Sequence, residues 1–163
     1  MAAPSGDELA KACRTAQLIG GALLASLGLY ALVIDLIQRT HTPFAGFAPG
    51  VPHDLLRWIF AALALTGLGL VRVVQRTVLA NAALPLLGRL TTAAIVAMAL
   101  CEAIAIYGLA LFVLAGRASD YYLFAGIALV GFGIYFPRRQ AWEEQASVLA
   151  RDAAGRGIKA PGS

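Results

Sequence analysis

Residues 90–116 contain a single charged side chain, Glu102, in an otherwise uncharged stretch. A helix of this length, rising about 1.5 Å per residue, can cross the roughly 30 Å hydrocarbon core of a bilayer. So long an apolar stretch predicts a membrane-spanning helix, which constrains the fold of the whole chain more than any other feature. It also raises the question of why one carboxyl lies near the middle of the span.

The composition supports a membrane protein. Of the 163 residues, 60% are hydrophobic and 13% are charged, too few charges to cover the surface of a soluble domain. The apolar residues come in long blocks and not in amphipathic stripes. The net charge is +4, but Lys and Arg cluster at the ends of the apolar blocks, which favours a role in membrane topology over nucleic-acid binding.

Four apolar blocks are long enough to cross a bilayer as helices. We therefore expect an all-α integral membrane protein with a four-helix transmembrane domain over residues 15–137. The second span has the shortest charge-free core, so Arg57 and Arg72 must extend toward opposite interfaces. The predicted spans are residues 15–37, 55–75, 86–115 and 120–137.

The distribution of Lys and Arg predicts the orientation. Ten of the 13 lie in the N-terminal segment, the connection between the second and third spans, and the C-terminal tail. Cytoplasmic loops are enriched in Lys and Arg, so both termini are expected in the cytoplasm, in a bacterial inner (plasma) membrane. Residues 1–14 then form a cytoplasmic segment. Residues 138–163 form a basic cytoplasmic tail, helical at first and disordered from Gly155 onward.

The chain resembles a tandem repeat of two helical hairpins. The segment "ALTGLGL" (64–70) in the second span matches "ALVGFGI" (128–134) in the fourth, and residues 24–33 match residues 100–110 more faintly. Parallel repeats of this kind occur in membrane proteins. The alternative is a chance match between segments built mostly of Ala, Leu, Gly and Val.

Glu102 is the principal candidate site. It follows Arg89 by 13 residues, about 20 Å along a helix, which puts the carboxyl near the midplane. A charge there costs several kcal/mol, so the neutral carboxylic acid is expected to be favoured. Ser26 in the first span reaches a similar depth and is the expected hydrogen-bond partner. Glu102 then either binds and releases a proton or acts as a structural hydrogen bond between helices.

The third span resembles the carboxylate-bearing helix of subunit c, the proteolipid of rotary ATP synthases. The shared features in residues 89–116, "RLTTAAIVAMALCEAIAIYGLALFVLAG", are the Thr pair, the alanine-rich approach, "EA" followed by "IYGL", and an apolar end. The resemblance implies that Glu102 is the ion-binding carboxylate. A sodium-type set of side chains is not evident around it, so the expected ion is a proton.

Two functions remain open at this stage. The first is a small polytopic, subunit c-like membrane protein in which Glu102 takes part in proton translocation. The alternative is a non-transporting scaffold or assembly subunit of a membrane complex. The expected partners are the lipid bilayer and other membrane subunits or a second copy of the chain. No nucleophile–base pair, phosphate loop or metal cluster is evident, so no enzymatic activity, catalytic residue, cofactor or metal is expected.

The remaining polar residues have ordinary structural interpretations. His41, His53 and Asp54 could bind a metal, but their spacing matches no known ligand pattern and an ordinary polar loop is favoured. Asp54 and Asp120 precede the second and fourth spans and are interpreted as helix N-caps. The two cysteines, in positions 13 and 101, are expected to be free thiols.

Overall fold

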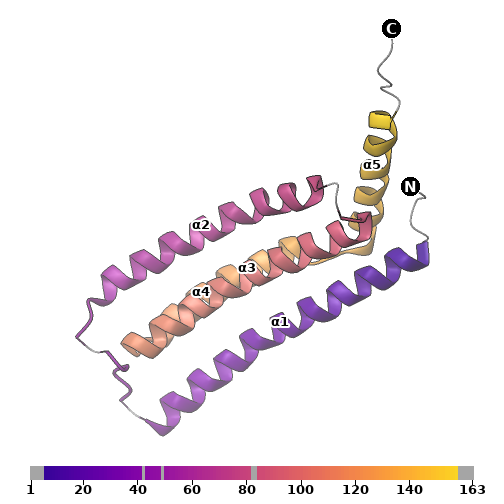
Figure 1. Ribbon diagram of the computed structural model, residues 1–163. Helices are drawn as coiled ribbons and strands as arrows, with labels where there is room; N and C mark the ends of the chain where they lie inside the picture. The colour runs from indigo at the N-terminus through magenta and orange to yellow at the C-terminus, as the bar shows by residue number, and fades with distance from the viewer. Residues whose placement is uncertain (1–5, 42, 49, 82–83, 158–163) are drawn as a thin grey trace.

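The computed structural model describes residues 6–41, 43–48, 50–81 and 84–157 (Figure 1). Within these residues every regular element is a helix. Four of the helices are long and apolar enough to cross a membrane. The elements in chain order are α1 (Gly6–Thr40), α2 (His53–Ala80), α3 (Leu86–Ala115), α4 (Ala118–Tyr135) and α5 (Arg139–Gly157).

The helix boundaries follow from proline and glycine. Pro52 and Pro85 immediately precede α2 and α3, where a fixed φ and a missing N–H cost the helix nothing. Gly116 ends α3 in the left-handed conformation, at φ 74°. The predicted span 86–115 therefore coincides with α3. The fourth helix covers residues 118–135, two residues earlier at each end than its predicted span.

The helix α3 lies at the centre of the bundle and packs against α1, α2 and α4. Figure 1 shows α1 and α2 on opposite sides of the α3–α4 pair. Small residues let α4 approach α3 closely. A Cβ on Gly108 would lie 2.8 Å from Cβ of Phe124 and 3.0 Å from Cα of Tyr121. Such backbone proximity is typical of helix pairs that associate through small residues.

The loop between α1 and α2 folds against the C-terminal end of α3. The backbone N–H of Phe47 donates to the carbonyl of Val113 at 2.9 Å, and that of Ala48 to the carbonyl of Leu114 at 3.0 Å. These carbonyls belong to the last turn of α3, which has no partners within the helix. The loop therefore completes the hydrogen bonding of α3 and ties the two connections at this end of the bundle together.

Large apolar side chains cover the outside of α1, α2 and α4. Leu18, Leu65, Val130 and Ile134 are each about two-thirds exposed or more, at 65–71%. Contiguous exposed apolar surface of this kind commonly marks contact with a membrane or a partner protein. The exposed surface is therefore compatible with apolar surroundings. The length and composition of the four long helices are compatible with a membrane as well.

The tail forms a longer helix than the sequence suggests. It continues to Gly157, past the predicted onset of disorder at Gly155, and residues 158–163 lie outside the described part. Figure 1 shows α5 leaving the end of the bundle at a steep angle. Trp142 is 4% exposed and packs into the main core cluster, so the first turns of α5 are anchored to the bundle.

Candidate functional site

Glu102 lies at the contact between α3 and α1, near the middle of α3. Oε1 of its carboxyl contacts Oγ of Ser26 in a hydrogen bond. The hydroxyl of Tyr30 donates to the same oxygen at 3.2 Å. Ser26 and Tyr30 are four residues apart, so they lie one turn from each other on the face of α1 that meets α3. All three side chains are partly buried.

The hydroxyl proton of Ser26 cannot serve both of its contacts. Its Oγ lies 2.6 Å from the backbone carbonyl of Leu23 and also contacts Glu102. A carbonyl only accepts, and a serine hydroxyl has a single proton. When Ser26 donates to Leu23, the bond to Glu102 requires a proton on the carboxyl. When Ser26 rotates its proton to Glu102, the carboxylate accepts from both Ser26 and Tyr30. The geometry thus accommodates both protonation states.

The surroundings of this carboxyl are apolar. Met98, Cys101 and Ala105, within four residues of Glu102 along α3, are completely buried. No ion pair involves Glu102 among the residues that the structure describes. The carboxyl therefore has two hydroxyl partners and no described cation within ion-pair distance.

Sequence reasoning identified part of this cluster. Ser26, named as the partner from its depth, contacts Glu102. Tyr30 was missed, although its place one turn after Ser26 was an available signal. Tyr107 of α3 does not take part, because its ring stacks on Phe60 of α2 with the centroids 5.6 Å apart.

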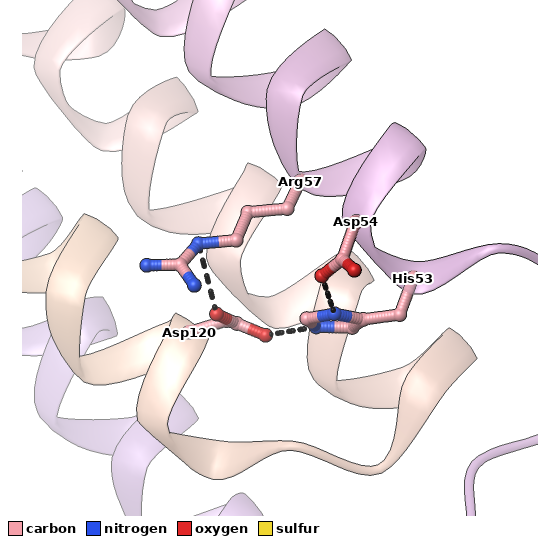
Figure 2. A network of polar contacts seen from close by, with 4 residues as sticks. All are labelled: His53, Asp54, Arg57 and Asp120. Carbon is pink, nitrogen blue, oxygen red and sulfur yellow. Dashed lines mark hydrogen bonds and ion pairs between the residues drawn. The ribbon is translucent and has the colours of Figure 1, made fainter.

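A second polar cluster lies where α2 and α4 begin (Figure 2). Asp120 in the first turn of α4 is 3% exposed. Its Oδ2 lies 2.5 Å from Nε2 of His53, and its Oδ1 lies 3.5 Å from Nε of Arg57. The other ring nitrogen of His53 lies 3.3 Å from Oδ1 of Asp54. The buried carboxylate is therefore compensated by one direct partner and by a more distant guanidinium.

This cluster corrects the predicted helix caps. Pro52 and Arg117 occupy the N-cap positions of α2 and α4, and neither makes a side-chain capping bond. Asp54 and Asp120 lie inside the first turns instead, where a negative charge is favourable for the helix dipole. The Asp120 carboxylate is directed toward α2, where it meets His53 and Arg57.

The two histidines have separate environments. His53 is in the Asp120 cluster, whereas His41 is exposed at the end of α1 and contacts the hydroxyl of Thr40 at 2.9 Å. No group of three or more His, Cys, Asp or Glu side chains suited to a metal occurs in the described ranges. Cys13 and Cys101 are both buried free thiols.

Comparisons of the chain with protein-family models, with curated proteins and with solved structures found no match. The two polar clusters are the features from which a function can be inferred. They differ in position, since Glu102 lies in mid-helix and Asp120 at a helix end.

Proposed function

We propose that the chain is an integral membrane protein in which α1, α2, α3 and α4 cross the bilayer and both termini lie in the cytoplasm. Their lengths, from 18 to 35 residues, and their apolar surfaces support this arrangement. The enrichment of Lys and Arg in the two terminal segments and in the α2–α3 connection supports the orientation.

Within that arrangement, Glu102 binds a proton near the midplane and takes part in proton translocation, as the resemblance to subunit c implies. One observation carries this proposal: a carboxyl in an apolar layer contacts two hydroxyl groups and no described cation. Ionisable groups in the membrane are costly and commonly functional. A carboxyl that has hydrogen-bond partners in both protonation states is suited to taking up and releasing a proton.

A second candidate function is a scaffold or assembly subunit of a membrane complex. The observation that favours it is that both partners of Glu102 belong to α1. Helix α1 packs mainly against α3, and its other side-chain bonds across the bundle include those from the Tyr121 hydroxyl to the Leu27 carbonyl and from the Gln17 amide to the Pro137 carbonyl. In this function Glu102 stays protonated and its hydrogen bonds fix α1 in place.

The test is carbodiimide modification of the protein in native membranes across a range of pH, read by mass spectrometry. A carbodiimide reacts with a protonated carboxyl that it can reach. The proposal expects labelling at Glu102 that decreases as pH rises and is absent in Glu102→Gln. Proton flux measured in proteoliposomes with a pH-sensitive dye should then be lost in Glu102→Gln.

The scaffold function makes the opposite prediction for the same samples. A carboxyl sealed between α1 and α3 is not labelled at any pH in folded protein. Since the amide of Glu102→Gln can replace the hydrogen bonds, that variant should then fold normally, while Glu102→Leu should be less stable. Absence of labelling together with this stability pattern would contradict proton translocation.

A further inference from the structure

A groove of about 400 Å³ lies between α2 and α4, and its lining is charged at one end and apolar along the rest. Asp54, Arg57 and Trp58 form the charged end. The apolar part is lined from both helices, chiefly by Leu65 and Leu68 of α2 and by Leu123 and Ile127 of α4. A site with this division matches a molecule that has a polar head and a hydrocarbon chain.

The length of the groove fits one leaflet of a bilayer. Its α2 positions extend from Asp54 to Leu68, a distance of about 21 Å along the helix. Half of a hydrocarbon core is about 15 Å thick, and the headgroup region lies outside it. With Arg57 and the 74% exposed Trp58 at the interface, the remaining groove has the depth of a single acyl chain.

Arg57 is the cation of the groove lining. Its Nε lies 3.5 Å from Oδ1 of Asp120, and Figure 2 shows one terminal nitrogen directed away from that carboxylate. The side chain is 47% exposed. A half-exposed guanidinium with a terminal nitrogen directed outward can donate to an oxygen of a phosphate.

The local charge excludes a strong preference for a purely anionic head. Asp54 and Asp120 contribute two negative charges, and Arg57 and His53 contribute at most two positive ones, so the cluster has no net positive charge. The carboxylate of Asp54 is 90% exposed beside Arg57, where it can accept hydrogen bonds from an ammonium group. A headgroup with both a phosphate and a primary ammonium complements this pair.

We propose that the groove binds a zwitterionic phospholipid of the phosphoethanolamine type. Its phosphate is bound by Arg57, its ammonium by Asp54, and one acyl chain lies between α2 and α4 along Leu65 and Ile127. The inference rests on the membrane insertion included in the proposed function, but it does not depend on proton binding by Glu102.

The test uses the full chain in lipid nanodiscs that contain equal amounts of phosphatidylethanolamine, phosphatidylglycerol and phosphatidylcholine with identical acyl chains. Native mass spectrometry counts the lipids that stay bound when the protein is released. Phosphatidylethanolamine should be retained preferentially. Arg57→Gln and Asp54→Asn should each reduce this preference roughly tenfold, the effect of losing about 1.4 kcal/mol.

Two further variants keep the test decisive if Arg57→Gln does not fold because Asp120 loses a partner. Leu65→Trp fills the apolar part without touching the charged cluster and should reduce retention of every lipid. Arg39→Gln is the matched control, because Arg39 pairs with Asp35 on the exposed side of α1, outside the groove lining. Its lipid retention should equal that of the unmodified protein.

Several outcomes would overturn the lipid assignment. These are equal retention of the three lipids, a preference for phosphatidylglycerol, or a lipid-free dimer in which a second copy occupies the groove. Protein that enters nanodiscs but shows no lipid preference contradicts only the proposal that the groove binds this lipid. Protein that retains the lipid but shows no carbodiimide labelling contradicts proton translocation alone, and protein that enters no discs contradicts membrane insertion, on which both rest.

Discussion

His53 and Asp120 are separated by 67 positions in the chain, and yet Nε2 of the histidine lies 2.5 Å from Oδ2 of the aspartate. The contact joins the first residue of α2 to the first turn of α4. Both helices pack on α3, so this bond fixes their starting positions relative to each other at one end of the bundle. It also sets the charged end of the groove between them.

The His53–Asp120 pair should be strongly coupled in stability. The two side chains are 13% and 4% exposed, so removing His53 leaves a buried carboxylate with only the distant Arg57. In a double-mutant cycle of His53→Ala and Asp120→Asn, we expect a coupling of roughly 1.5 to 3 kcal/mol, as for hydrogen bonds to charged groups. The free energy of unfolding in detergent micelles is the measurement.

The matched comparison is the Asp35–Arg39 pair of α1. Its side chains are 52% and 76% exposed, so its double-mutant cycle should show a coupling close to zero. Equal coupling energies for the two pairs would show that the burial of Asp120 has no energetic consequence, contrary to the expectation.

The long apolar helices were predictable from the sequence and this polar contact was not. The length and apolarity of residues 86–115 determine α3 locally, and Pro85 and Gly116 set its ends. The contact of His53 with Asp120 depends on how α2 and α4 are rotated about their axes, which no local pattern specifies. An available signal was that both residues were expected at the same end of the bundle.

In the Glu102 cluster, too, one contact could be predicted from the sequence and another could not. Ser26 could be named because depth along a helix follows from residue counts. Tyr30 could not be assigned from depth alone, since its reach to Oε1 depends on the face that α1 turns toward α3.

Ser26→Ala and Tyr30→Phe should each weaken the contact between α1 and α3. Interhelical hydrogen bonds in membrane proteins contribute on average about 0.6 kcal/mol and at most about 1.7 kcal/mol to stability. Ser26 also lies 2.6 Å from the Leu23 carbonyl, so the loss in Ser26→Ala reports how its single proton is shared. Unfolding in mixed detergent micelles measures the loss. A larger effect of Tyr30→Phe would mean that Ser26 bonds mainly to the Leu23 carbonyl.

Gly108→Ala should destabilise the α3–α4 pair. The added methyl group would lie 2.8 Å from Cβ of Phe124 and 3.0 Å from Cα of Tyr121, and the backbone of Tyr121 can yield only if α4 shifts. Overpacking of this kind costs roughly 1 to 3 kcal/mol. The control is Gly126→Ala in α4, where a Cβ meets nothing within 4 Å and no loss of stability is expected. Thermal unfolding of both variants in the same detergent distinguishes the two sites.

Gly46→Ala should release the α1–α2 loop from the end of α3. Gly46 has φ 80°, and a Cβ there would lie 2.3 Å from the carbonyl oxygen of Leu114. The left-handed conformation alone costs a non-glycine residue roughly 1 to 2 kcal/mol, and the clash adds to it. The amides of Phe47 and Ala48 in this loop donate to the carbonyls of Val113 and Leu114. These two amides should therefore exchange faster with deuterium in the variant. Gly50→Ala, in the same loop with open space around it, should leave both stability and exchange unchanged, and an equal change in the two variants would contradict a specific role for Gly46.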